Sequence, residues 1–203
     1  MLRRERIADV EAGRLEAVVI GTSAGGINAL GVILPALPAE TPFPVVVVVH
    51  MPPREASPIV SVFKSRCAIA ISEPRDKEDV TGGVAWFAPP NYHLLVESDH
   101  TFALSIEAPV NHCRPSIDAL FESAASAYGR HLVAVVLTGA NEDGAEGVAA
   151  VREAGGIVIV QDPATAEMPL MPRAASARAQ PDAMGTLQEI AAVLRAGAIA
   201  RHR

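Results

Sequence analysis

The 203-residue sequence is poor in aromatic side chains and cysteines, and it has no excess of positive charge. Aromatic residues make up only 4% of the chain, which argues against recognition of nucleic-acid bases by stacking. The formal net charge of −6 argues against attraction to phosphate backbones. We therefore expect no nucleic acid among the partners of this protein.

The two cysteines, Cys67 and Cys113, lie far apart and form neither a disulfide framework nor a cysteine-rich zinc site. We expect both to be idle thiols in a reducing compartment. Apolar runs such as Val45–Val49 are far shorter than the ~20 residues that span a bilayer. The charged N-terminus lacks the apolar core of a secretory signal, so the sequence predicts a cytoplasmic protein with no membrane insertion.

Apolar residues are abundant, since 50% of the chain is hydrophobic and 20% is charged. This composition is too apolar for a disordered chain, and a chain of about 200 residues buries a large core. We expect one domain over residues 14–198, with a charged N-terminal tail at 1–13 and a short C-terminal tail at 199–203.

Short apolar runs and helical spacings alternate along most of the chain. Strands are expected at 17–20, 45–49, 68–71, 132–137 and 157–160. Helices are expected at 25–34, 57–67, 115–128, 143–153, 171–179 and 187–196. Three more strand-like runs, separated by turn residues, lie at 84–88, 93–97 and 101–106. The pattern predicts an α/β fold: a doubly wound, mostly parallel sheet with helices on both faces in three layers, and an antiparallel excursion at one edge.

Three polar side chains follow three of the expected strands. Ser23 lies in a glycine-rich turn after the first strand, His50 follows the valine strand, and Asp143 follows the strand at 132–137. In a doubly wound sheet the site lies at the carboxyl ends of the strands, so we expect these side chains to meet. Hydroxyl, imidazole and carboxylate are the groups that nucleophilic acyl transfer requires.

The spacing Gly21-x-Ser23-x-Gly25 fits a nucleophile exposed on a sharp strand-to-helix turn. Alone the motif is weak, because a glycine-rich turn with no chemistry has the same pattern. A phosphate-cradling loop is a further alternative, although the lysine of such loops is missing. The chain order serine, histidine, aspartate also differs from the order in ordinary α/β-hydrolases.

The other two candidates have competitors as well. His93 and His112 are not excluded by spacing, whereas His131 begins a strand and therefore lies at the wrong end for the site. Asp143 starts an expected helix, where an aspartate often serves only as the N-cap. His50 is favoured because a continuous valine strand delivers it to a strand end.

Taken together, six stretches resemble the catalytic domain of the CheB-type chemotaxis protein-glutamate methylesterases. They occur in the order and spacing of that family and cover nearly the whole chain. The stretches are IGTSAGG (20–26), VHMP (49–52), APPNYHLL (88–95), RPSIDALF (114–121), LTGANEDGA (137–145) and MPRAA (171–175).

The resemblance implies a cytoplasmic enzyme that hydrolyses glutamate γ-methyl esters on the cytoplasmic helices of chemoreceptors. Some family members also deamidate receptor glutamines. The implied catalytic triad is Ser23, His50 and Asp143, in which His50 takes the serine proton and Asp143 orients His50. The backbone N–H groups of His50 and Ala140 are the implied oxyanion donors, and neither a metal nor an organic cofactor is needed.

The chain also departs from the family pattern. Ala24 stands where a threonine is common, and Ala140 stands where a methionine is common. Family members commonly carry an N-terminal receiver domain, for which the residues before the first expected strand leave no room. We therefore expect no activation by phosphorylation within this chain, and a separate regulator is left open.

Two other classes of function remain to be separated from the enzyme. One is a non-catalytic receptor-docking module of the same fold, and the other is a nucleotide-binding domain that uses the glycine-rich turn. Because the net charge is negative, docking to acidic receptor helices requires a local basic patch. The candidates for it are Arg54, Lys64, Arg66 and Arg114.

Overall fold

The structure, a computed structural model, describes residues 4–50 and 59–201. Its strands are β1 (Ala17–Thr22), β2 (Val45–Val49), β3 (Ala70–Ser72), β4 (Val84–Phe87), β5 (His93–Val96), β6 (Phe102–Ser105), β7 (Leu132–Val136), β8 (Ile157–Gln161) and β9 (Ala183–Gly185). Among the described residues, seven of them form one sheet in the order β3-β4-β2-β1-β7-β8-β9, with every neighbouring pair parallel. The predicted mostly parallel sheet is confirmed.

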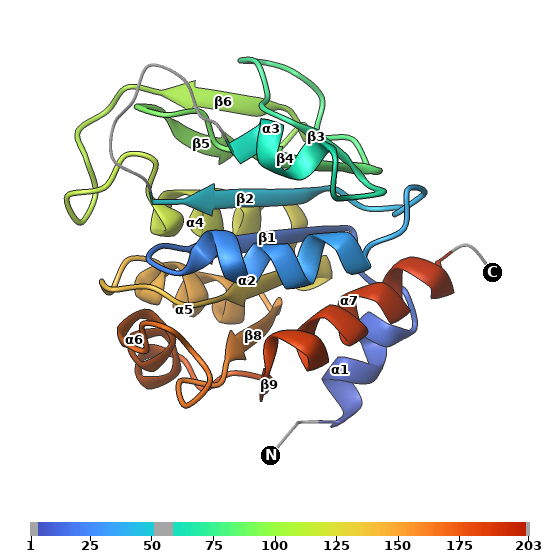
Figure 1. The fold of residues 1–203 in the computed structure, drawn as a ribbon. Coiled ribbons are helices and arrows are strands. Elements are labelled where there is room, and N and C mark those ends of the chain that lie inside the picture. The colour runs from blue at the N-terminus through green and yellow to red at the C-terminus, as the bar shows by residue number, and fades with distance from the viewer. Residues whose placement is uncertain (1–3, 51–58, 202–203) are drawn as a thin grey trace.

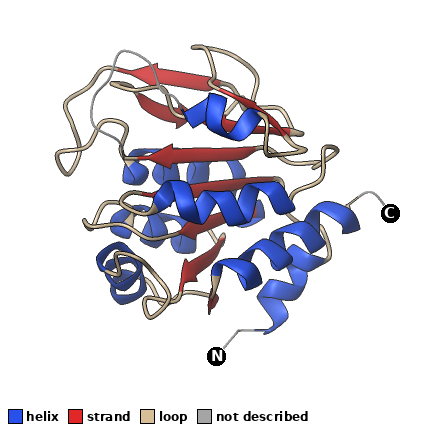
Figure 2. Ribbon diagram, in the orientation of Figure 1, coloured by secondary structure: helices blue, strands red, loops and turns tan. Residues whose placement is uncertain are grey.

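Helices cover both faces of this sheet, as Figures 1 and 2 show. They are α1 (Arg4–Glu11), α2 (Gly26–Ile33), α3 (Ile59–Lys64), α4 (Ile117–Tyr128), α5 (Ala145–Glu153), α6 (Leu170–Arg178) and α7 (Leu187–Ala200), with short 3₁₀ turns at Leu34–Ala36 and Gly129–His131. Helices α2 and α7 lie on one face, and α4 and α5 lie on the other. The three-layer, doubly wound arrangement is therefore as predicted.

The valine strand β2 shows why the sheet lies between two cores. All five of its side chains are buried, because alternate residues of a strand point to opposite faces. Val45, Val47 and Val49 belong to the core under α2, α3 and α7. Val46 and Val48 belong to the core under α4, α5 and α6. A run of β-branched residues is therefore expected at the centre of a parallel sheet.

The middle of the chain differs in part from its prediction. Strands β5 and β6 pair antiparallel as a separate ribbon, as predicted for an antiparallel excursion. Strand β4, expected to belong with them, instead pairs parallel with β2 and β3 and is part of the main sheet. Its Trp86 and Phe87 are buried, so the place of this strand inside the main sheet removes large apolar side chains from water.

The predicted N-terminal tail is a helix for most of its length. Ile7 and Val10 of α1 are buried in the core that α7 also covers. Arg6 donates to the carbonyl oxygens of Gly155 and Gly156 and forms an ion pair with Asp182 at 3.2 Å. Charged residues in α1 obscure two buried apolar positions one turn apart, so the sequence pattern does not reveal this helix. At the other end, α7 extends to Ala200, beyond the predicted boundary.

Candidate active site

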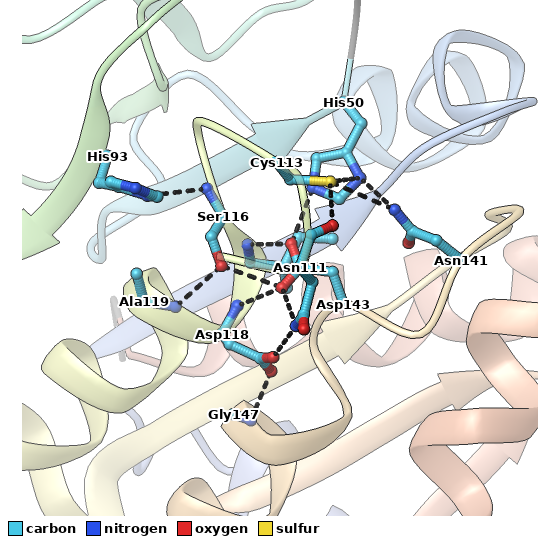
Figure 3. A network of polar contacts seen from close by, with 11 residues as sticks. His50, His93, Asn111, Cys113, Ser116, Asp118, Ala119, Asn141, Asp143 and Gly147 are labelled. Atoms are coloured by element: carbon cyan, nitrogen blue, oxygen red, sulfur yellow. Dashed lines mark hydrogen bonds and ion pairs between the residues drawn. The ribbon is translucent and has the colours of Figure 1, made fainter. Parts of the chain in front are cut away.

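The ends of two central strands place Ser23 and His50 side by side. In the pairing of β1 with β2, Thr22 lies opposite Val49, so Ser23 and His50 are the first residues beyond each strand. The His50 N–H continues the ladder and donates to the Thr22 carbonyl oxygen at 3.0 Å. The loop after β7 returns Asp143 to the same edge of the sheet, as Figure 3 shows.

Two glycines allow the start of α4 to approach this edge closely. A Cβ on Gly21 would lie 2.4 Å from Cγ2 of Ile117, and one on Gly144 would lie 2.8 Å from the same atom. Gly144 also has a φ of 97°, which disfavours any residue with a side chain. The first turn of α4 therefore packs directly against β1 and against the loop that carries Asp143.

Asp143 is fully buried and is held by the first turn of α4. Its Oδ1 accepts hydrogen bonds from the Ser116 hydroxyl at 2.9 Å, the Asp118 N–H at 3.3 Å and the Asn111 amide at 3.4 Å. Its Oδ2 accepts the Ile117 N–H at 2.7 Å. A carboxylate at a helix N-terminus is also stabilised by the helix dipole, so this aspartate is fixed in place and kept negative.

The pKa values of the two neighbouring carboxyl groups move in opposite directions. Burial alone would raise the pKa of Asp143, but hydrogen bonds from His50, Ile117 and Ser116 outweigh it and hold that pKa below its usual value. Burial raises the pKa of Asp118 to about 6, against the hydrogen bond from the Gly147 N–H, and the charge of Asp143 raises it further. Asp143 is therefore the first of the two to ionise as pH rises.

His50 uses one ring nitrogen for Asp143 and presents the other to the opposite side. Its Nε2 lies 2.8 Å from Asp143 Oδ2, and only 11% of the side chain is exposed. Because the carboxylate only accepts, Nε2 carries the proton and Nδ1 carries the lone pair. Nδ1 accepts from the Asn141 amide at 3.2 Å and lies 3.7 Å from the Cys113 sulfur.

Cys113 is partly buried and contacts His50, a neighbour that no sequence pattern predicts. Its S–H donates to the Asn111 carbonyl oxygen at 3.4 Å, and its sulfur accepts from the Asn141 amide at 3.4 Å. Burial raises the pKa of the Cys113 thiol, and the charge of Asp143 raises it further. The sulfur is therefore a protonated thiol and not an activated nucleophile.

Ser23 lies in an open pocket that also reaches His50. The pocket has a volume of about 430 Å³, and its wall is formed by the turn at 23–28 together with Val49, His50 and Glu167. The serine is half-buried, and no hydrogen bond among those of the described residues joins it to His50. The turn itself is set by Gly25, whose φ of 81° marks the start of α2.

The two backbone groups expected as oxyanion donors differ in availability. The His50 N–H is already donated to the Thr22 carbonyl, so the strand ladder competes for it. The Ala140 N–H has no acceptor among the hydrogen bonds of the described residues. The geometry therefore favours Ala140 over His50 for that role.

The competing histidines are placed elsewhere. His93 is 3% exposed, accepts the Ser116 N–H at its Nδ1, and contacts the Ala108 carbonyl with Nε2. His93 therefore uses both ring nitrogens for backbone groups at Ala108 and at the start of α4. His112 is exposed and lines a second pocket beside His50 and Cys113, with a volume of about 220 Å³.

The expected basic patch is not assembled by the described residues. Lys64 ends α3 and Arg66 follows it, next to the start of β3 and therefore at the opposite edge of the sheet from His50. Arg114 does line the pocket beside His50, where its guanidinium donates to the carbonyl oxygens of Ile106 and Glu107. Arg54 lies outside the described residues.

Several residues of the site were not among those that the sequence reasoning singled out for it. These are Asn111, Cys113, Ser116, Asp118 and Asn141. A signal for Ser116 existed, because a serine after a proline and three residues before Ala119 is a good helix N-cap, and its hydroxyl does accept the Ala119 N–H. The loop residues Asn111, Cys113 and Asn141 are brought to His50 only by tertiary structure.

The fold and this cluster define a class: doubly wound α/β domains with a hydroxyl, an imidazole and a carboxylate at one sheet edge. Residues 18–194 match the family model described as CheB methylesterase. The chain belongs to the CheB methylesterase family. The resemblance found in the sequence is thereby confirmed.

Curated relatives carry names that agree with this family. A Leptospira interrogans protein is 48% identical over 87% of this chain and 91% of its own length. Its name gives it, provisionally, the activities of a protein-glutamate methylesterase and a protein-glutamine glutaminase. A protein-glutamate methylesterase/protein-glutamine glutaminase of Trichodesmium erythraeum is 40% identical over 78% of this chain but only 46% of its own length.

A solved structure agrees as well. The Thermotoga maritima CheB methylesterase catalytic domain matches with a TM-score of 0.86 and 33% identity, over 89% of this chain and 97% of that one. The described residues contain no helix long and apolar enough to cross a membrane.

Proposed function

We propose that this protein is a serine esterase that hydrolyses γ-methyl esters of glutamate side chains on the cytoplasmic helices of chemoreceptors. The names of its relatives support this substrate, and they support extending the proposal to glutamine side-chain amides. The observation that carries the proposal is the orientation of His50. A buried aspartate holds one nitrogen of this ring, and the ring borders the pocket that contains Ser23.

In the proposed mechanism, His50 Nδ1 takes the proton of the Ser23 hydroxyl while the serine oxygen attacks the ester carbonyl. Since Nδ1 has one lone pair, the Ser23 hydroxyl replaces the Asn141 amide as its donor. Asp143 stabilises the imidazolium through Nε2 and fixes the tautomer. As the bond from the carbonyl carbon to the methoxy oxygen breaks, the imidazolium protonates this oxygen, so that methanol leaves and the glutamyl ester on Ser23 remains.

Water completes the reaction in the same pocket. His50 removes a proton from the water as it attacks the glutamyl ester on Ser23, and the serine leaves as a hydroxyl. The Ala140 N–H is the proposed donor to the developing oxyanion, because it is uncommitted among the described hydrogen bonds. With ammonia as the leaving group, the same steps convert glutamine to glutamate.

The test replaces the proposed nucleophile. We expect Ser23→Ala to lower methanol release from methylated receptor by at least about 10⁴-fold, because the covalent step is lost. Its unfolding free energy should stay within about 0.5 kcal/mol of the parent, since Ser23 is half-buried and its hydroxyl makes no hydrogen bond with the described part of the chain.

A serine-directed fluorophosphonate provides an independent readout and separates the enzyme from a receptor-docking module. The parent should be labelled at Ser23 and the variant should not. Methanol release at the parental rate by folded Ser23→Ala, or a parent that binds receptor but is never labelled, would overturn the proposal.

A further inference from the structure

The side of His50 that faces away from Asp143 forms a pair of ligand atoms with Cys113. The Nδ1 of His50 and the sulfur of Cys113 are 3.7 Å apart. In a tetrahedral zinc site, bonds of about 2.05 Å to nitrogen and 2.3 Å to sulfur place these two atoms about 3.6 Å apart. The pair is therefore already at the separation that a shared metal ion requires.

The hydrogen bond behind His50 is also the one that metal-binding histidines make. A histidine that binds a metal usually donates its other ring N–H to a carboxylate, which fixes the tautomer and makes the ligating nitrogen more basic. Here Nε2 donates to Asp143 at 2.8 Å, and α4 holds Asp143 in turn. The lone pair on Nδ1 is therefore aimed at Cys113 by a rigid support.

A third side chain lies beside this pair, at the place of a third ligand atom. The amide nitrogen of Asn141 donates both to His50 Nδ1 at 3.2 Å and to the Cys113 sulfur at 3.4 Å. The Cys113 S–H also donates to the Asn111 carbonyl oxygen, and the His50 nitrogen and the sulfur both accept from the Asn141 amide.

The other atom of the same amide lacks a partner. The Asn141 Oδ1 is buried and accepts no hydrogen bond among the described residues. A half-turn of the amide would bring this oxygen to the place of the nitrogen, as a third ligand atom. An unsatisfied buried oxygen is costly where it stands, and a bond from this oxygen to a cation would offset that cost.

We propose that His50, Cys113 and Asn141 form a binding site for a borderline-soft divalent cation, with Zn²⁺ as the best fit. The ligands are Nδ1, a thiolate and Oδ1, and a water molecule from the adjoining pocket of about 220 Å³ fills the fourth position. Binding releases the thiol proton of Cys113 to solvent, so charge and atoms balance.

A metal at this site would act as a reversible inhibitor. It takes the lone pair of Nδ1, which is the base for Ser23 in the proposed function, and this consequence alone rests on that proposal. The prediction that no metal is needed concerns catalysis and is compatible with an inhibitory ion. The metal and the Ser23 proton therefore compete for the single lone pair of Nδ1, which binds one or the other.

Binding is tested without reference to activity. We expect each molecule of the parent protein to bind one Zn²⁺ ion, measured in competition with a chromophoric chelator. With Co²⁺ in place of Zn²⁺, the parent should show a thiolate-to-metal charge-transfer band. Cys113→Ser and Cys113→Ala should lose the band and bind Zn²⁺ at least tenfold more weakly. The matched control is Cys67→Ser, which removes the other half-buried thiol and should leave both readouts unchanged.

Two further variants test whether Asn141 is a ligand of the metal and whether Ser23 is not. Asn141→Ala should weaken Zn²⁺ binding several-fold, and Ser23→Ala should leave it unchanged. No charge-transfer band in the parent, or folded Cys113 variants with the parental Zn²⁺ affinity, would overturn the proposal.

Inhibition is a separate arm. At a Zn²⁺ concentration that saturates the parent, methanol release should fall at least tenfold and return on chelation. A Cys113→Ala enzyme should keep a larger fraction of its own metal-free rate. Metal binding with no methanol release at any Zn²⁺ concentration would reject the proposed function and leave the site standing, whereas activity that is insensitive to bound Zn²⁺ would reject the inhibitory role.

Discussion

The two sides of His50 differ in how firmly they are built. On one side, Asp143 is completely buried and accepts hydrogen bonds from a hydroxyl, an amide and two backbone N–H groups besides the imidazole. On the other side, Ser23 is half-buried at the mouth of an open pocket, and Nδ1 is met by an asparagine and a thiol. The molecule fixes the carboxylate and the ring, and leaves the nucleophile loosely held.

This contrast suits a reaction on another protein. Groups that only orient and stabilise charge are most effective when they are fixed before substrate arrives. In the proposed function the serine has to meet a glutamate side chain carried on a large helix, and an open pocket would admit it without rearrangement of the core. Stability and catalysis therefore depend on the same residues around Asp143 and on different residues around Ser23.

The substitution expected to disturb the Asp143 side of His50 most is Asp143→Asn. An amide would present an NH₂ group to neighbours that only donate, and it would no longer hold the Nε2–H tautomer of His50. We expect methanol release to fall by about 10⁴-fold, as for loss of the orienting carboxylate in other serine triads. Circular dichroism should show a folded protein, and a loss below tenfold in that folded protein would contradict the proposed role.

A pH experiment separates the two carboxyl groups on the Asp143 side of His50. The pKa of Asp118 is about 6 in the folded protein, above its ordinary value, so the folded state binds more protons and its stability falls as pH rises from about 4 to 6. In Asp118→Asn this loss is absent. The variant should therefore gain about 2 kcal/mol relative to the parent between pH 4 and pH 7, measured by urea unfolding.

The same experiment checks the sign of the coupling. A stability difference between parent and Asp118→Asn that is flat across this pH range would show that Asp118 is not held neutral by its surroundings. Asp143, whose pKa is lowered, is present in both proteins.

The smallest expected effect is that of Ser116→Ala. The hydroxyl both caps α4 and donates to Asp143, so its loss should cost about 1–2 kcal/mol of unfolding free energy and lower kcat about tenfold. Ser123→Ala is the matched control on the same helix, since its hydroxyl contacts only backbone groups. Ser123→Ala should lose stability with kcat unchanged, and an equal drop in kcat for both would remove Ser116 from the positioning network.

Much of the fold follows from local pattern. The β-branched run of β2 and the apolar run of β7 identify the centre of the sheet, because strands buried on both faces have no polar side to preserve. Strand β4 was assigned to the wrong partner, since nothing in four residues specifies which neighbour they pair with. Helix α1 was missed because two buried side chains on a charged helix leave a weak periodic signal.

The site divides in the same way. The strand-end rule brings Ser23, His50 and Asp143 to one edge, because parallel strands end together. Which nitrogen of His50 faces Asp143 depends on side-chain geometry that no spacing encodes. The neighbours Asn141 and Cys113 come from loops of irregular backbone, whose course is set by tertiary contacts.

The packing of α1 against α7 has a practical consequence for anyone who wishes to immobilise the protein. Arg201 at the end of α7 donates to the Leu15 carbonyl, and a Cβ on Gly197 would lie 2.5 Å from the Val10 carbonyl oxygen, so the two terminal helices clasp each other. Leu15 precedes β1, which places this clasp at the edge of the sheet where the strands begin (Figure 1). A bead, dye or sensor chip coupled there would be attached at the end of the sheet opposite to Ser23. The Ser23 pocket would then remain accessible to a partner in solution.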